Sequence, residues 1–509
     1  MKRISSLYLV LVLTCSLWAQ EAHEIARKYA KTITANDFKA HLTFLADDLL
    51  EGRETGERGQ IMAAHYIRTH FMRVGLAPGL TENNSYYQEY FIRKTQIKEA
   101  SIKIGKKSFA FGEGFFSTNL PKDLEGEWVF GGYGISQKSY DNLEGLEVQN
   151  KNVIIFAGSP EEDSEVSMSV VREWRSRADI FEEKGTKNLL MILPDDWFQR
   201  MSRFARRQSL STSNDDSRLS ILYISEDLAK ALLAKAKTNP LKLKNAINNN
   251  AIVPKLSFKK MQLQYQANVD RNELIPTNVL GFLEGRDKKE EIIVITAHYD
   301  HIGINRRGVI NNGADDDGSG TTAVLELAEA FALAAKDGHR PRRSILFMTV
   351  SGEEKGLLGS AYYTAHPVYP LENTIANLNI DMIGRIDPTY EKRADSTNYI
   401  YLIGSDKLST DLHEIGEWAN DTFTQLTLDY TYNDENDPNR FYYRSDHYNF
   451  AKHGVPVIFY FNGTHKDYHR PTDDVDKIKF DKAAKVTRLI FHTAWELANR
   501  AERIKVDTR

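Results

Sequence analysis

Hydrophobic residues follow two spacings in the second half of the chain. Short, almost continuous apolar runs recur near 278–283, 291–297, 344–350, 375–381, 398–403 and 455–461. Between them, apolar residues repeat at helical spacing near 320–336, 356–363, 408–421, 445–452 and 480–502. A continuous apolar run is typical of a buried strand, and an amphipathic segment is typical of a helix that covers a sheet. The alternation predicts a three-layer α/β/α sandwich around a mostly parallel mixed sheet.

The first hundred residues predict further helices of the same domain. Residues 22–75 have helical spacing, and Asn36 and Asp37 are candidate caps for the helix that begins there. A charged, glycine-rich loop follows at 51–59, and a second helix is expected to end at Gly75.

The middle of the chain has a different pattern of hydrophobic and polar residues. Short β-like runs lie at 128–130, 153–156, 189–193 and 221–224, and helical stretches lie near 169–184 and 226–236. Polar, turn-rich loops separate them, and the stretch has no cluster of histidines and carboxylates with metal-ligand character. We therefore predict that residues 100–270 form a separate small α/β domain, inserted between residues 20–99 and 271–509 of one larger domain.

The composition of the chain limits its possible binding partners, and its first residues indicate its cellular compartment. The chain has 509 residues, is 41% hydrophobic and has a formal net charge of −4, which gives no electrostatic reason to bind nucleic acid or an anionic membrane. Lys2 and Arg3 precede an apolar run at 7–13, which predicts a signal peptide of residues 1–19 with cleavage after Ala19. We therefore expect an exported protein, periplasmic or secreted.

Cys15, the only cysteine, lies inside the predicted signal peptide. Thr14 before it fits a lipoprotein signal poorly, so lipoprotein anchoring is the less favoured alternative. The mature chain is then exported without disulfides and depends on the size of its core for stability. No later run is long and apolar enough to span a membrane.

Candidate metal ligands follow several of the predicted strands. The strand near 291–297 is followed by His298, Asp300 and His301, and then by a loop with Asp315, Asp316 and Asp317. Later strands are followed by Glu353 and Glu354, by Asp381, and by His465, Asp467, His469, Asp473 and Asp474. Residues that end the strands of an open α/β sheet point into one crevice. This recurrence favours a metal site over a set of solvated turns.

The chemistry of these side chains favours zinc. Carboxylates mixed with imidazoles suit zinc, and one catalytic zinc needs about three protein ligands plus a water. The larger set present here suggests two metals about 3.5–4 Å apart, bridged by a carboxylate. Such a pair lowers the pKa of a shared water toward ~7, and a carboxylate that is not a ligand can take its proton. Glu353 beside Glu354 supplies a base and a ligand from adjacent positions.

These motifs resemble those of the co-catalytic di-zinc aminopeptidases, whose relatives include bacterial leucyl aminopeptidase, glutamate carboxypeptidase and the transferrin receptor. The resemblance covers roughly 30–90 and 272–485. It is carried by Ala-His-Tyr-Asp at 297–300, Gly-Ala-Asp-Asp-Asp-Gly-Ser-Gly at 313–320, Gly-Glu-Glu-Lys-Gly at 352–356, Asn-Ile-Asp-Met at 379–382 and Tyr-His-Arg-Pro-Thr-Asp at 468–473. More weakly, 130–135 and 152–156 resemble a protease-associated domain.

The resemblance implies two Zn²⁺ per chain. Carried over residue by residue, it places Asp316 as the bridging ligand, with His298 and Asp381 completing one site. Glu354 and His469 would complete the other.

The resemblance also assigns roles to residues that are not ligands. Glu353 would be the general base, and Asp300 would orient His298, as metal-bound imidazoles usually require. Tyr468 is similar in position to a tyrosine that polarises the substrate carbonyl in some members. The peptide between Asp316 and Asp317 is expected to be cis.

Other residues near these motifs have plainer interpretations. His301 and His465 match no ligand position and are expected to be structural, as is the loop around Arg53. The sequence Ser445-Asp446-His447 suggests a hydrolase triad, but no Gly-x-Ser-x-Gly motif exists, so we expect a helix start with supporting polar contacts. His-Glu-x-x-His is also absent, which excludes the metallopeptidases built on that helix.

The hypothesis is an exported zinc exopeptidase that acts on peptides with a free N-terminus, with the inserted domain restricting access. A carboxypeptidase or dipeptidase on the same scaffold stays open; a carboxypeptidase would need a cation such as Arg385 or Arg444 to hold a C-terminal carboxylate. A glutaminyl cyclase would use one zinc, and a transferrin-receptor-like binding protein would have lost ligands. Side-chain preference and oligomeric state are not determined by the sequence.

Overall fold

The computed structural model describes residues 23–508 except 118, 138–139, 159–176, 204, 206–208, 212–218, 251–252, 257, 259–260 and 262. The predicted signal peptide, its cleavage after Ala19 and the position of Cys15 lie outside the described residues and stay predictions. No helix in the described part of the chain combines the length and the apolar character needed to cross a bilayer.

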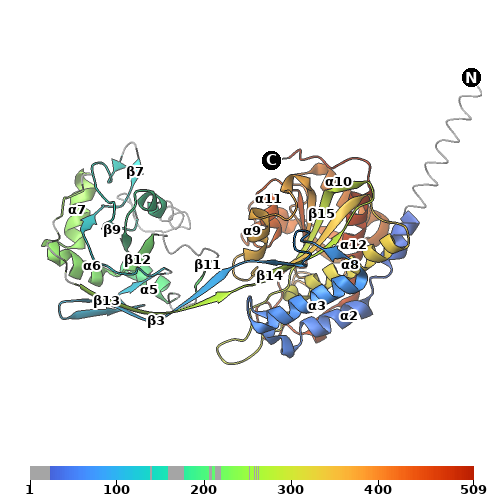
Figure 1. Ribbon diagram of the computed structural model, residues 1–509, viewed down its shortest axis with the longest axis horizontal. Helices are drawn as coiled ribbons and strands as arrows, with labels where there is room; N and C mark the ends of the chain where they lie inside the picture. The colour runs from blue at the N-terminus through green and yellow to red at the C-terminus, as the bar shows by residue number, and fades with distance from the viewer. Residues whose placement is uncertain are drawn as a thin grey trace, which may run out of the picture. The chain divides into compact units, whose positions relative to one another are not determined.

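The described chain folds into two compact units (Figure 1). One comprises the described residues up to Phe91 together with those from Leu274 onward, and the other comprises Ile92–Glu273. Each unit has a hydrophobic core made of its own residues. The predicted domain limits at 99/100 and 270/271 lie near the limits of the units. The protease-associated assignment of the inserted segment stays a prediction.

The larger unit is built around a nine-stranded mixed sheet. Its strands are β1 (Ala77–Pro78), β2 (Tyr87–Glu89), β14 (Thr277–Leu283), β15 (Lys288–His298), β16 (Arg343–Val350), β17 (Thr374–Ile380), β18 (Tyr399–Ile403), β19 (Thr427–Asp429) and β20 (Val457–Phe461). Their order is β1-β14-β16-β15-β17-β20-β18-β19, with β2 also on β14. The neighbours β16, β15, β17 and β20 run parallel, whereas β14 and β18 pair antiparallel with them. The predicted mostly parallel mixed sheet is confirmed.

Helices cover both faces of this sheet (Figure 1). They are α2 (Ala35–Leu45), α3 (Arg58–Val74), α8 (Gly320–Lys336), α9 (Leu358–Ala365), α10 (Thr410–Ala419), α11 (His447–Ala451) and α12 (Phe480–Asn499). On β15, Ile293 and Ile295 pack into the core that includes α2, α3, α8 and α12, whereas Ile292 and Val294 pack with residues of α9 and α11. Successive side chains of a strand point to opposite faces, so this alternation confirms the three-layer α/β/α sandwich.

The cap of α2 differs from the prediction. The N-cap is Thr34, which has an extended backbone and accepts the N–H of Asp37 at 3.2 Å. The predicted cap at Asn36 or Asp37 is therefore wrong, because both residues already lie in the first helical turn. There the carboxylate of Asp37 faces the positive end of the helix dipole instead.

The inserted unit contains the four strands predicted for it. A five-stranded sheet has the order β5-β12-β10-β9-β6. Its strands are β5 (Phe115–Phe116), β6 (Trp128–Phe130), β9 (Asn152–Phe156), β10 (Asn188–Ile192) and β12 (Ser220–Ile224). Its helices include α5 (Asp195–Ser202), α6 (Glu226–Leu233) and α7 (Pro240–Asn250). Part of the helix predicted at 169–184 lies outside the described residues.

A second sheet of the inserted unit was not anticipated. It is formed by β3 (Ile92–Ile104), β4 (Lys107–Ala110), β11 (Ser209–Ser211) and β13 (Leu263–Leu274). Strand β13 is rich in polar residues and most of its side chains are exposed. Such a strand lacks the apolar run on which the prediction of buried strands depends.

Candidate metal centre

Four parallel strands bring the predicted site residues to one edge of the sheet. His298 is the last residue of β15, and Asp381 directly follows β17. Glu353 and Glu354 lie in the turn after β16, and His469 lies in the loop after β20. Because β16, β15, β17 and β20 are adjacent and parallel, their carboxyl ends open onto one crevice. Residues far apart along the chain thus meet there.

One group of candidate ligand atoms centres on His298. Its Nε2 atom lies 3.3 Å from an oxygen of Asp316 and 3.6 Å from an oxygen of Asp381. An oxygen of Glu353 lies 3.9 Å from the same nitrogen. Ligand atoms around a tetrahedral zinc ion lie about 3–4 Å apart. His298, Asp316 and Asp381 are therefore spaced to share one cation, with Glu353 beside them.

A second group centres on Glu354. The Nε2 atom of His469 lies 3.1 Å from Glu354 Oε2 and 3.1 Å from Asp316 Oδ2. The Nδ1 atom of His301 lies 2.9 Å from Glu354 Oε1 and 3.7 Å from Asp316 Oδ2. The two oxygens of Asp316 therefore face different groups, which is the placement that a bridging carboxylate requires.

Donor atoms in both groups lack ordinary hydrogen-bond partners. Among the described residues, His298 Nε2, His301 Nδ1, Asp316 Oδ2 and Glu354 Oε1 are buried without one. Buried polar atoms in native proteins are nearly always satisfied, and an ion is one of the ways in which this happens. The mixture of imidazole nitrogens and carboxylate oxygens, with their spacing, fits zinc.

The imidazoles and carboxylates of the centre change one another's pKa. Burial lowers the pKa of His469, but its close contacts with the carboxylates of Asp316 and Glu354 outweigh this effect and raise the pKa to about 10. Burial also disfavours the charged form of His298, yet the charge of Glu353 and of neighbouring carboxylates raises its pKa well above the ordinary value. Burial raises the pKa of Glu353 well above its usual range. Metal binding to such a set competes with protons.

The orientation of His298 is set by the backbone of Asp300. His298 Nδ1 lies 3.0 Å from the carbonyl oxygen of Asp300 and 3.8 Å from its carboxylate. The carboxylate itself accepts the hydroxyl of Thr55 at 2.6 Å and the N–H of Glu353 at 3.3 Å. Asp300 therefore holds His298 through its carbonyl and the turn of Glu353 through its side chain. The predicted role of Asp300 in orienting a metal-bound His298 stays a prediction.

The loop that carries Asp316 is held by its neighbour. The peptide between Asp316 and Asp317 is cis, which confirms the expectation from the resemblance. The carboxylate of Asp317 accepts the backbone N–H groups of Gly320, Met382 and His298 at 2.8, 3.0 and 3.3 Å. It thereby connects the loop to the ends of β15 and β17.

Two histidines that match no ligand position in the resemblance lie close to the centre. His465 Nε2 is 3.3 Å from Asp315 Oδ2, one residue away from the bridging position. His301 instead enters the centre itself through its contact with Glu354. The only sequence signal for this was its place in the loop that follows His298, because the direction of a loop side chain has no periodicity.

The Ser445-Asp446-His447 sequence does not form a hydrolase triad. Ser445 donates its hydroxyl to Asp381 Oδ2 at 2.7 Å, and Asp446 accepts the hydroxyl of Ser360 at 2.5 Å. The ring nitrogens of His447 have no side-chain partner among the described residues. The expectation of supporting polar contacts is confirmed, since Ser445 holds a predicted metal ligand.

A pocket adjoins the centre. Its lining includes Asp316, Glu353, Asp381, Met382, Phe441, Arg444, Phe459, Phe461, Thr464 and Tyr468. The ring of Tyr468 stacks on that of His469, with 4.0 Å between centroids.

Arg444 is exposed, whereas Arg385 is buried and bonded to Asp467 and Asp473 at 2.6 and 3.2 Å. Of the two arginines considered for a carboxypeptidase, only Arg444 faces this pocket.

Comparison with known proteins identifies the segment that carries the centre. Residues 278–494 match the model of Peptidase family M28. The segment belongs to peptidase family M28. It contains the candidate residues of both ligand groups, from His298 to His469.

Curated proteins with related sequences cover the M28 segment. A probable leucine aminopeptidase of Arthroderma otae is 32% identical over 217 residues, which are 42% of this chain and 55% of that protein. Aminopeptidase YwaD of Bacillus subtilis is 25% identical over 236 residues, which are 45% of this chain and 46% of that protein. The chain thus spans about half the length of the curated relatives it matches.

A solved structure is similar over nearly the whole chain. An aminopeptidase from Aneurinibacillus sp. strain AM-1 aligns with a TM-score of 0.52 over 95% of this chain and 98% of that one. Its sequence is 18% identical, so the likeness shows the fold alone.

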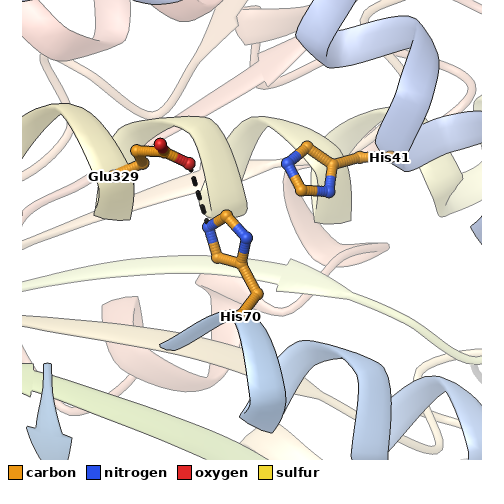
Figure 2. A group of neighbouring side chains, drawn as sticks. All are labelled: His41, His70 and Glu329. Atoms are coloured by element: carbon orange, nitrogen blue, oxygen red, sulfur yellow. Dashed lines mark ion pairs between the residues drawn. The ribbon is translucent and has the colours of Figure 1, made fainter. Parts of the chain in front are cut away.

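A third group of possible ligands shares only Glu329 with the M28 segment (Figure 2). His41 of α2, His70 of α3 and Glu329 of α8 point toward one another. Here, however, Arg73 forms an ion pair with Glu329 and lies 3.4 Å from His70 Nδ1. The other nitrogen of His70 is 3.1 Å from the carbonyl oxygen of Leu325. Because the protein supplies its own cation and partners, this group is a hydrogen-bonded cluster between helices.

Proposed function

We propose that the protein is a zinc-dependent aminopeptidase that binds two metal ions and removes N-terminal residues from peptides. The observation that carries the proposal is the pair of ligand groups joined by the two oxygens of Asp316, with Glu353 beside them. Two curated relatives of the M28 segment bear the name aminopeptidase, which supports the reaction class.

We assign the metals to the two ligand groups as the resemblance implies. His298 and Asp381 would hold one ion, Glu354 and His469 the other, and Asp316 both. Zinc bound there would supply Lewis acidity for the scissile carbonyl and lower the pKa of a water molecule. The protein keeps the ligands in place through buried contacts, such as that between Ser445 and Asp381.

Glu353 would take the proton of the attacking water. Its carboxylate lies close to the ligand atoms, 3.9 Å from His298 Nε2, but it belongs to neither set of predicted ligands. The backbone N–H of Glu353 is fixed by Asp300 at 3.3 Å, which positions the turn. After accepting the proton, Glu353 would deliver it to the leaving amine.

The pocket beside the centre would hold the N-terminal residue of the peptide. Carboxylates that line it, including Glu353, would bind the free α-amino group, and the phenol of Tyr468 would donate to the developing oxyanion. The rings of Phe441, Phe459 and Phe461 provide apolar surface for the side chain.

The predicted signal peptide supports an exported enzyme that meets peptides outside the cytoplasm, periplasmic or secreted. We propose cleavage after Ala19. N-terminal sequencing of the exported protein tests this proposal, and a chain that still begins at Met1 would contradict it.

The function is tested with Glu353→Gln, which keeps the shape of the side chain and removes the base. On an amino-acid anilide, kcat should fall by about 10²–10⁴-fold while the zinc content stays at two ions per chain. The exposed residue Glu414, substituted in the same way as a control, should leave kcat unchanged. Turnover of Glu353→Gln at the wild-type rate would rule out the base assignment.

A metallo-carboxypeptidase is the second candidate, because Arg444 faces the pocket and could bind a terminal carboxylate. The same assay distinguishes the two by comparing peptides blocked at one end. An aminopeptidase cleaves peptides with an amidated C-terminus and not those with an acetylated N-terminus. The opposite preference would favour the carboxypeptidase.

A further inference from the structure

His301 lies inside the metal centre without a place in either predicted ligand set. The residue is fully buried, and its Nδ1 atom lies 2.9 Å from Glu354 Oε1. Glu354 Oε2 is 3.1 Å from His469, so the two oxygens of this carboxylate face two different imidazoles. The imidazole of His469 completes a predicted ligand set, whereas the imidazole of His301 belongs to neither set.

The ring of His301 is fixed by the loops on both sides of the centre. Its backbone N–H donates to the carbonyl oxygen of Arg53 at 3.1 Å. Gly313 packs directly on the ring: its φ is +55°, and a Cβ atom there would lie 2.5 Å from Cγ of His301. The contact with Gly313 and the backbone hydrogen bond to Arg53 therefore confine the ring beside Glu354.

The two ring nitrogens show which atom carries the proton. In His298, Nδ1 donates to a carbonyl and leaves Nε2 free for a ligand role, the usual pattern of a metal-bound histidine. In His301, neither ring nitrogen makes a hydrogen bond of ordinary geometry among the described residues, but Nδ1 lies 2.9 Å from a carboxylate oxygen of Glu354. If Nδ1 bound a metal, Nε2 would carry a buried, unsatisfied proton. The tautomer with the proton on Nδ1 avoids this cost and donates to Glu354.

We propose that His301 is a positioning residue that holds Glu354 by donating its Nδ1–H to Oε1. The other oxygen, Oε2, is then held toward the position shared with His469 and Asp316. This inference rests on the proposed two-metal function. Its consequence is that His301 sets the affinity of the second metal position without binding the metal itself.

The test uses substitutions that replace one ring nitrogen at a time. In His301→Asn, the amide nitrogen stands where Nδ1 stood, whereas in His301→Gln it stands near the position of Nε2. Zinc binding to the metal-free full-length protein is measured by calorimetric titration. We expect His301→Gln and His301→Ala to weaken the second binding event by about 10–100-fold. His301→Asn should stay within about threefold of wild type.

The controls separate this proposal from the one on which it rests. His492, a buried histidine of α12, is replaced by Gln and should bind zinc as the wild type does. Wild-type affinity in His301→Ala, or a loss in His301→Asn as large as in His301→Ala, would overturn the positioning role. Fewer than two zinc ions in the wild-type protein would instead contradict the proposed function.

Discussion

At the scale of the residue, three consecutive aspartates have three environments. An oxygen of Asp315 accepts the N–H of Gly384 at 2.6 Å, and the carboxylate of Asp317 accepts backbone N–H groups. Only Asp316 directs both oxygens at imidazoles. The role of each carboxylate is therefore decided by the groups that surround it rather than by its residue type.

Glu326 provides a pH-dependent prediction at this scale. Burial raises its pKa to about 8, and the charges of Asp37 and Glu329 add to the effect. An unfolded glutamate titrates near ~4.3, so between these values the folded state holds a proton that the unfolded state has lost. Stability therefore falls as the pH rises from about 4.3 to about 8. Glu326→Gln should match the wild type at pH 4 and exceed its free energy of unfolding at pH 8 by on the order of 1–3 kcal/mol.

Denaturant unfolding at several pH values checks this expectation. Other charged and titratable groups near Glu326 include His41, at 3.6 Å, Arg73 and Tyr66. Glu414→Gln, on the exposed surface, serves as the control and should show no pH-dependent difference from wild type. If the free energies of unfolding of Glu326→Gln and the wild type differed by the same amount at every pH from 4 to 8, the assigned titration of Glu326 would be wrong.

At the scale of the element, one buried arginine connects the loops around the centre. Arg53 is 1% exposed and donates to the carbonyl oxygens of Tyr299, Asn312 and Gly313 at 2.8, 2.7 and 2.9 Å. These carbonyls belong to the two ends of the connection between β15 and α8. The expectation that the loop around Arg53 is structural is confirmed by these contacts.

Arg53→Lys should destabilise the protein although it keeps the charge. A single ammonium group cannot reach three separated carbonyls, so buried acceptors lose their donors. We expect a loss of about 3–5 kcal/mol, visible as a lower melting temperature. The matched control is Arg58→Lys, since Arg58 forms an exposed ion pair with Glu51 and should change stability by less than about 0.5 kcal/mol. A melting temperature of Arg53→Lys equal to that of the wild type would contradict the structural role.

At the scale of the whole molecule, the two units have separate hydrophobic cores. One core contains residues of the central sheet and of α8 and α12, and the other contains residues of the five-stranded sheet of the inserted unit. All the candidate ligands lie in the larger unit. Metal binding should therefore stabilise one unit and not the other.

Scanning calorimetry of the full chain should show two unfolding transitions. A chelator should lower one of them, because a ligand stabilises the state that binds it. Leu190→Ala, in the buried strand β10, should lower the temperature of the other transition, because the substitution reduces the free energy of unfolding of the inserted unit by about 2–5 kcal/mol. If both changes moved the same transition, the units would unfold together and the independence of the cores would be wrong.

The strands and their terminal residues were predictable because burial leaves a continuous apolar run and a strand end is an abrupt change in polarity. His298, Glu353 and Asp381 could be identified in this way. The contact of His301 with Glu354 could not, since the residue lies in a loop. The same limit applied to the cap at Thr34 and to the polar strand β13, where local backbone geometry and pairing outweigh the hydrophobic pattern.

The sequence alone determined the α/β/α architecture, the residues able to bind a metal and the segment where the chain departs from the main domain. Periodicity and polarity carry that information, because both follow from burial along the chain. Only the tertiary structure decided which oxygen of Asp316 faces which imidazole, and that His301 contacts Glu354. Such choices depend on distances of a few ångströms between segments joined by the sheet, and no local pattern encodes them.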